Sequence, residues 1–470
     1  MLSERDAPII AVATPPGKGA VGMVRISGKN LQNFANALCQ HVLEPRHAHL
    51  INLQDANGQT LDQVLALFFP APHSYTGEDV LELQGHGGPV VLSMLVERCL
   101  ELAQKSELGL AGLRLAMPGE FTQRAYFNQK IDLAQAEAVS DVIDAQTQAA
   151  VRGAGRSLVG AFSKQVEKLQ EKLLRVRMLV EASLDFPEED IDFVTQADVA
   201  GQLRHMQEEV HLLCAKTRQG ALLRDGMKMV IAGQPNAGKS SLLNALTGQD
   251  TAIVTPMAGT TRDVLTQTIS IEGVPVHVVD TAGLRDTQYV DEVEKIGIER
   301  AWAQVADADV VVLLHDLSRS QEADYSAQQT ALINQVMLQK PGHSPLLHVF
   351  NKTDLVAMPS PTGHHQPAVC ISAKTGQGLQ ELCTFLLQSV GWLADHQEGV
   401  FSARMRHVQA LERVQTHLDQ AQGVLKSSMA ALDLLAEELR CAQQQLSSLT
   451  GEMSADDLLG EIFSRFCIGK

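Results

Sequence analysis

The most constraining feature of this 470-residue chain is the motif G-x-x-x-x-G-K-S at residues 233–240. The apolar run before it, residues 227–232, predicts a buried strand, and residues 241–246 predict a helix. A glycine turn between a strand and a helix lets backbone N–H groups converge on phosphate oxygens at the helix N-terminus. Lys239 is then expected to reach the terminal phosphates, and the Ser240 hydroxyl to hold Mg²⁺. The sequence therefore predicts a nucleoside triphosphate site formed by Asn236, Ala237, Gly238, Lys239, Ser240 and Ser241.

A second motif, N-K-x-D, predicts that the nucleotide is GTP. It follows an apolar run that begins at residue 346 and consists of Asn351, Lys352, Thr353 and Asp354. The Asp354 carboxylate can accept hydrogen bonds from the ring N–H and the exocyclic amino group of guanine, a pair of donors that adenine lacks. Asn351 and Lys352 are expected to brace the loop. A later segment is expected to offer backbone donors to the guanine carbonyl: Ser372, Ala373 and Lys374. Alone, N-K-T-D is also common in surface turns, but its order after the phosphate motif favours guanine.

Two further motifs complete the pattern of a GTPase. Residues 274–279 predict a strand that ends in D-T-A-G, formed by Asp280, Thr281, Ala282 and Gly283. Asp280 is expected to hold Mg²⁺ through water, and the Gly283 amide to sense the γ-phosphate. The segment G-T-T-R-D at residues 259–263 offers Thr261 as a second Mg²⁺ ligand. Five such elements in this order predict a Ras-like P-loop G domain over roughly residues 226–390.

One position departs from the Ras pattern. Where Ras-type proteins carry a water-orienting glutamine, this chain has Leu284, whose apolar side chain cannot position water. Arg285 and Glu294 are candidates for that catalytic role, although the acidic residues 291–294 can equally be the first turn of a helix that complements its dipole. The side-chain amide of Asn236, inside the phosphate loop, can ligate a monovalent cation.

Composition limits the class of protein. The net charge is −17, from 38 basic and 55 acidic residues, which argues against a broad nucleic-acid surface but not against a local basic patch. The seven cysteines form no C-x-x-C pair, and no run of 18 apolar residues or signal segment occurs. A reduced, cytoplasmic protein without a membrane span is expected.

The pattern of glycine turns and apolar residues along the chain predicts a multidomain α/β plus α architecture. Residues 1–128 predict an α+β domain, with glycine turns at 15–19 and 84–88 and a helix over 89–103. Apolar residues recur at helical spacing in 129–224 and again in 393–470, on either side of a G domain at 225–392. We expect both helical blocks to form one bundle interrupted by the inserted G domain. A coiled-coil dimer arm is the alternative for part of these helices.

Several segments together resemble the MnmE (TrmE) family of tRNA modification GTPases, in the TrmE/Era-like Ras-type superfamily. The resemblance covers essentially the whole chain. It is sharpest at residues 13–19, 75–88, 118–121, 280–285 and 296–302 and at the C-terminal C-I-G-K, residues 467–470. It implies a homodimer, joined through the N-terminal domain, that acts on tRNA as a heterotetramer with a FAD-dependent MnmG-type protein. The pair would install an aminomethyl or carboxymethylaminomethyl group at C5 of the wobble uridine.

The resemblance also implies two further ligands. The one-carbon unit would come from 5-formyl- or methylene-tetrahydrofolate, held by the N-terminal domain through Arg25, Glu82, Lys130 and Lys470. K⁺ would take the place of an arginine finger, with Asn236, Thr255, Met257 and Thr260 as its ligands. The same loop would complete the GTP site through Thr255, Pro256, Met257, Ala258, Gly259, Thr260 and Thr261.

The family pattern favours Glu294 as the residue that orients the attacking water, and leaves the role of Cys467 open. Pro256 departs from the family in the potassium loop. The rival functions are a ribosome-assembly or RNA-binding GTPase switch, and a nucleotide-gated scaffold that hydrolyses GTP feebly. The first would carry a basic RNA-binding domain, which the sequence does not suggest.

Overall fold

The chain forms two compact units, which are described separately: Met1–Ser140 with Leu446–Lys470, and Asp141–Gln445. The computed structural model describes residues 6–105, 108, 110, 112–185, 197–248, 266–280, 301–342, 344–356, 367–393, 399–427, 431–451, 462–464, 466 and 469. Within these ranges, no helix has both the length and the apolar character that a membrane crossing requires.

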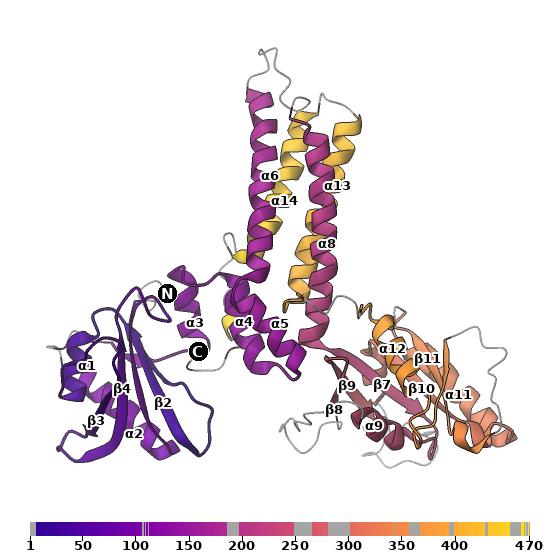
Figure 1. Ribbon diagram of the computed structural model, residues 1–470, viewed down its shortest axis with the longest axis horizontal. Coiled ribbons are helices and arrows are strands. Elements are labelled where there is room, and N and C mark those ends of the chain that lie inside the picture. The colour runs from indigo at the N-terminus through magenta and orange to yellow at the C-terminus, as the bar shows by residue number, and fades with distance from the viewer. Residues whose placement is uncertain are drawn as a thin grey trace. The chain divides into compact units, whose positions relative to one another are not determined.

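The first unit is built on a six-stranded sheet with the order β3-β4-β5-β2-β1-β6. Its strands are β1 (Ile9–Val12), β2 (Gly19–Gly28), β3 (His49–Gln54), β4 (Thr60–Phe69), β5 (Asp79–Gly87) and β6 (Arg114–Leu115). All neighbours are antiparallel except β1 and β6. The helices α1 (Gln32–Cys39) and α2 (Pro89–Ala103) bury Phe34, Leu38 and Leu95 against one face of the sheet (Figure 1). The helix α3 (Glu120–Phe127) follows β6.

The helix predicted over 89–103 is confirmed, but the glycine turn predicted at 84–88 is wrong. Residues 84–87 continue β5, which pairs with β2 as far as Gly87 opposite Gly19. A Cβ atom on Gly87 would lie 2.6 Å from the Gly19 carbonyl oxygen, and one on Gly85 would lie 2.5 Å from Asp62 Oδ2. These glycines therefore allow close approach between strands rather than a change of chain direction.

The second unit contains the parallel sheet that the phosphate motif predicts, with the order β12-β11-β10-β7-β9-β8. Its strands are β7 (Met227–Gly233), β8 (Thr266–Ile271), β9 (Val274–Asp280), β10 (Val310–Asp316), β11 (Leu346–Asn351) and β12 (Ala368–Cys370). Only β8 runs antiparallel to its neighbour. Helices α9 (Lys239–Thr247) and α12 (Leu379–Ser389) cover one face, while α11 (Ala323–Gln339) covers the other. The apolar runs are continuous because the sheet is buried on both faces.

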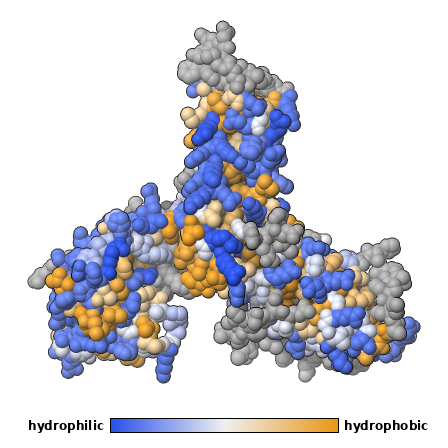
Figure 2. Space-filling view, viewed as in Figure 1, coloured by the Kyte–Doolittle hydropathy of each residue, from blue (hydrophilic) through white to orange (hydrophobic). Residues whose placement is uncertain are grey.

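Four long helices form a bundle that belongs to the second unit except for the last five residues of α14: α6 (Ala161–Asp185), α8 (Val199–Asp225), α13 (Met405–Ser427) and α14 (Leu432–Thr450) (Figure 1). Polar pairs join each helix to the next: Lys172 with Glu209, Gln207 with Asp419, His417 with Glu438, and Arg177 with Gln443. Figure 2 shows mainly hydrophilic residues on the visible face of this bundle. The prediction of one bundle, formed by both helical blocks around an inserted Ras-like domain, is confirmed. The shorter helices α4 (Leu133–Asp144) and α5 (Gln148–Leu158) precede it.

Candidate functional site

The phosphate loop has the geometry that its sequence predicts. The strand β7 ends at Gly233 and α9 begins at Lys239, with Gly238 as its N-cap at φ 99°. Asn236 also adopts a left-handed conformation, with φ 64°. The Lys239 ammonium donates to the Gly233 carbonyl at 2.8 Å, so it already lies over the loop. Ser240 and Ser241 occupy the first turn of α9, where backbone N–H groups are available to an anion.

Asn351 joins the phosphate loop to the two loops expected at the base. Its side chain lies at the end of β11 and is only 2 % exposed. The Nδ2 atom donates to the Ala237 carbonyl at 2.9 Å, and Oδ1 accepts from the Ala373 backbone N–H at 3.0 Å. A Cβ atom on Gly238 would lie 2.3 Å from Asn351 Nδ2, so glycine is required there for this contact as well as for its φ. One amide thus holds three predicted segments together.

The base-recognition loop carries an exposed carboxylate held at a defined place. The Ser372 hydroxyl, which is fully buried, donates to Asp354 Oδ1 at 2.7 Å. The backbone of Thr353 donates to the Ile371 carbonyl at 3.2 Å. Asp354 is therefore fixed at one oxygen while its side chain stays at the surface, which suits a carboxylate that must face a ligand. Lys374 lies exposed in the neighbouring turn.

Lys352 adopts φ 70° and donates from Nζ to Asp316 Oδ2 at 2.6 Å. Asp316 ends β10 and is 2 % exposed. Burial alone would raise the pKa of Asp316, but hydrogen bonds from Lys352 and Ser318 outweigh it and hold that pKa below its usual value. Sequence reasoning missed Asp316, although an acidic residue at the end of a strand with five apolar residues, separated from them by His315 alone, was an available signal.

The first unit brings two of the four residues expected at the folate together. Arg25 and Glu82 are opposite each other on β2 and β5, with Nε donating to Oε1 at 2.9 Å. The Arg25 guanidinium lies 5.3 Å from the ring centre of Tyr75 and 5.8 Å from that of Phe121. It also donates to the Gly469 carbonyl at 3.5 Å. A cation, a carboxylate and aromatic rings in one location suit a flat heterocycle with donors and acceptors.

Lys130 is not in contact with that pair. Its Nζ donates to the Pro72 carbonyl at 3.0 Å, in the loop that also carries Tyr75. Its stem lies beside the same loop, because a Cβ atom on Gly77 would be 3.3 Å from Lys130 Cγ. Lys130 therefore borders the Tyr75 loop rather than the Arg25–Glu82 pair itself.

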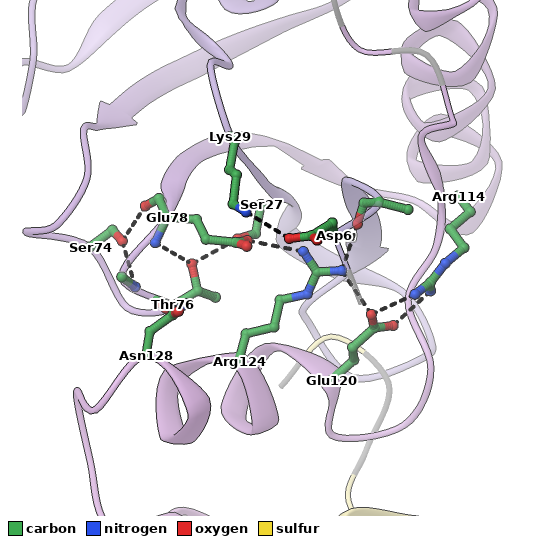
Figure 3. A network of polar contacts seen from close by, with 12 residues as sticks. Asp6, Ser27, Lys29, Ser74, Thr76, Glu78, Arg114, Glu120, Arg124 and Asn128 are labelled. Atoms are coloured by element: carbon green, nitrogen blue, oxygen red, sulfur yellow. Dashed lines mark hydrogen bonds and ion pairs between the residues drawn. The ribbon is translucent and has the colours of Figure 1, made fainter. Parts of the chain in front are cut away.

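A buried ion network joins the loop that carries Glu78 to α3 (Figure 3). Arg124, from α3, donates to Glu78 at 3.0 Å and to Glu120 at 2.9 Å, and all three side chains are at most 10 % exposed. Arg114 adds two hydrogen bonds to Glu120, at 2.8 and 2.7 Å. Burial would raise the pKa of Glu120, yet the arginine partners hold it below its usual value. The network ties the Tyr75–Glu78 loop to α3, the two elements that carry the aromatic rings facing Arg25, Tyr75 and Phe121.

Several predicted site residues lie outside the described part of the chain, so their roles stay predictions. The backbone of Asp280 ends β9, but its side chain is also outside. The others are Thr255, Pro256, Met257, Ala258, Gly259, Thr260, Thr261, Thr281, Ala282, Gly283, Arg285, Glu294, Cys467 and Lys470.

Known proteins resemble this chain over its full length. A family described as "MnmE helical domain" matches residues 133–467, and one described as "GTP-binding protein TrmE N-terminus" matches residues 8–130. The "tRNA modification GTPase MnmE" of Paracidovorax citrulli (strain AAC00-1) is 55% identical over 486 residues, covering 100% of both chains. That of Acidovorax sp. (strain JS42) is 57% identical over 473 residues, again covering 100% of both. Among solved structures, the G domain of the T. maritima FeoB iron transporter is 26% identical, covering 35% of this chain and 98% of that one, with a TM-score of 0.27.

Proposed function

Because the chain belongs to the MnmE family of tRNA modification GTPases, we propose that it is a potassium-dependent GTPase that modifies C5 of the tRNA wobble uridine with a FAD-dependent MnmG-type partner. The chain is a GTP hydrolase of tRNA modification. The added aminomethyl or carboxymethylaminomethyl group would take its one-carbon unit from 5-formyl- or methylene-tetrahydrofolate. The observation that carries the nucleotide part is the Asn351 amide, which joins the phosphate loop to the base loop.

In this proposal the nucleotide lies across the carboxyl edge of the parallel sheet. Asp354 accepts from guanine, Lys239 contacts the terminal phosphates, and Ser240 with Thr261 holds Mg²⁺, which would neutralise charge on the β- and γ-phosphates. Substitution Asp354→Asn tests the assignment, because an amide donates where xanthine offers a carbonyl. Titration calorimetry should show preference for xanthosine diphosphate over GDP in this variant. A variant that still prefers GDP contradicts the site.

Potassium dependence is proposed because Leu284 cannot orient water or supply charge. The Asn236 side chain stands in the phosphate loop on a left-handed backbone, and an amide oxygen is a suitable ligand for a hard monovalent cation. GTP turnover by the full chain should be much faster in KCl than in NaCl at equal ionic strength. Asn236→Ala should remove that difference, whereas Asn244→Ala, an exposed asparagine on α9, should keep it. Equal turnover in the two salts contradicts this part of the proposal.

The folate part is supported by the Arg25–Glu82 pair and its aromatic neighbours. Equilibrium binding of 5-formyl-tetrahydrofolate should be lost in Arg25→Ala. The matched control is Lys29→Ala, which removes an exposed cation directly after β2 whose ammonium pairs with Asp6 at 2.6 Å. Binding that survives in the Arg25 variant, or falls equally in both variants, contradicts this site.

The remaining parts of the proposal concern assembly and organisation. We propose a cytoplasmic homodimer that forms a heterotetramer with its partner on tRNA, and domain bounds of 1–128, 129–224, 225–392 and 393–470. Glu294 orients water, Arg285 assists it, and Lys470 closes the folate site. Mass spectrometry of wobble nucleosides from cells that lack this chain tests the reaction: unmodified uridine at C5 is expected, and intact modification contradicts it.

A further inference from the structure

Tyr325, in the first turn of α11, connects two loops that lie far apart in the sequence. Its side chain is 4 % exposed. The backbone N–H of Asp316 donates to the Tyr325 hydroxyl oxygen at 2.7 Å, and the Gln234 side-chain amide donates to the Tyr325 carbonyl at 2.9 Å. The Arg319 guanidinium stacks on the ring at 5.0 Å from its centre, which fixes the ring plane. Tyr325 thus contacts β10 through its side chain and the phosphate loop through its backbone.

Each of these two contacts leads on to a residue of the nucleotide site. The Gln234 carbonyl accepts from Lys239 Nζ at 3.4 Å, and its own side chain is 6 % exposed. Asp316 accepts from Lys352 Nζ at 2.6 Å, and its other oxygen accepts from the Ser318 hydroxyl at 2.6 Å. A continuous path of hydrogen bonds therefore runs from the phosphate lysine to the lysine of the base-recognition motif.

This path is a second bridge, separate from the one that Asn351 makes. Asn351 reaches the backbone of Ala237, whereas Tyr325 reaches the side chain of Gln234, at the other end of the phosphate loop. The Asn351 contact joins the phosphate loop to the base-recognition loop at one point, about which one loop could still rotate relative to the other. A second contact fixes the relative orientation of the two loops, and the two hydrogen bonds that Asp354 would make to a guanine edge depend on that orientation.

We propose that Tyr325 is a positioning residue for guanine recognition, which holds the base-recognition loop in register with the phosphate loop without touching the nucleotide. This inference rests on the proposed role of Asp354. The phenol contributes by satisfying a backbone N–H at the end of β10, which keeps Asp316 where it meets Lys352. The Lys352 ammonium is then held at Asp316, which fixes the stem of that side chain beside the expected place of the base.

The test compares the full-length chain with Tyr325→Phe, which removes only the hydroxyl. Inosine diphosphate lacks the exocyclic amino group of guanine, so the ratio of its Kd to that of GDP reports how well Asp354 is placed. Because one hydrogen bond of a buried group is worth roughly twofold to tenfold in an equilibrium constant, we expect that ratio to fall by about threefold or more. A merely structural loss lowers the fraction of active protein but leaves the ratio unchanged.

The control is Tyr126→Phe, which removes a tyrosine hydroxyl that donates to the Gly451 carbonyl in the other unit, and it should keep the wild-type ratio. Melting temperatures and far-ultraviolet circular dichroism of both variants establish that they fold. An unchanged ratio in Tyr325→Phe overturns the inference, whether or not affinity for both nucleotides falls. Asp354→Asn, measured alongside, separates the two failures: if it keeps its GDP preference, the guanine site itself is wrong, and if it switches, only the role of Tyr325 is.

Discussion

The substitution Asn351→Asp tests the contact on which the nucleotide site depends. The introduced carboxyl keeps the shape of the amide, and one oxygen can still accept from the Ala373 N–H. The other oxygen replaces a donor that lies 2.9 Å from the Ala237 carbonyl oxygen, in a place that is 2 % exposed. The lost hydrogen bond costs about 1 kcal/mol, and the unpaired buried oxygen adds roughly 1–3 kcal/mol. Because the free variant can release this contact whereas the bound site needs it formed, the cost appears in the affinity, and GDP binding should weaken by about 30-fold to 1000-fold at neutral pH.

Titration calorimetry of GDP as a function of pH separates this reasoning from general damage. Burial raises the pKa of a carboxyl group, and the protonated form is again a donor toward Ala237. Affinity of the Asn351→Asp variant should thus recover as the pH falls from neutral toward 5. Asn351→Ala is the control, because it loses both hydrogen bonds and titrates nothing there. Binding by the Asp variant within threefold of wild type at neutral pH refutes the argument, as does an equal recovery with acid in the Ala variant.

Two other perturbations test the polar clusters that support the sites. Asp141→Asn should destabilise the second unit by about 2 kcal/mol, because Asp141 accepts from Arg224 at 2.7 Å and from Arg404 at 2.8 Å, and Arg224 remains partly exposed to water. The midpoint of urea unfolding, followed by circular dichroism, measures this loss. An unchanged midpoint counts against the prediction. Because the pKa of Glu120 is lowered in the folded state, its contribution to stability is fully present above the unfolded-state pKa and is lost as the pH falls through the folded-state pKa. The difference in free energy of unfolding between wild type and Glu120→Gln should therefore shrink in acid. A difference that stays constant with pH shows that this carboxylate does not contribute.

The fold was predictable wherever its signal is local. The strand before the phosphate motif, the helix after it and the helix at 89–103 appear in the structure nearly within their expected bounds. The glycines of residues 84–88 wrongly predicted a turn, because the requirement for glycine there comes from a strand that is distant in the sequence. Gly87 is needed where the Gly19 carbonyl passes within 2.6 Å of its missing Cβ, and that approach arises only when β2 and β5 pair.

The residues around the candidate nucleotide site also differ in whether the local sequence could predict them. Asn351, Lys352 and Asp354 were predicted as site residues because the side chains expected to read guanine belong to one motif of four consecutive residues. Tyr325 and Gln234 were missed because their contact spans 91 residues, Tyr325 belongs to no motif, and Gln234 occupies an unspecified position of the phosphate motif. A tyrosine in an amphipathic helix is ordinarily a core residue, and only the distances at both of its ends show that it also connects two loops.

The attachment of the helices to the inserted sheet limits how a nucleotide can influence them. Strands β7 and β9 are parallel, so their starts lie at one edge of the sheet and Gly233 and Asp280 lie at the other. The helices attach at the starting edge: α8 ends directly before β7, and the Thr147 hydroxyl, at the N-cap of α5, donates to the Gly273 carbonyl before β9 at 2.7 Å. Each strand has seven residues and therefore spans about 20 Å between the two edges. Strand β9 is hydrogen-bonded along both sides, to β7 and β8. Within the described residues, β7 and β9 thus connect the edge of the sheet that carries the phosphate loop to the edge where α8 and α5 attach.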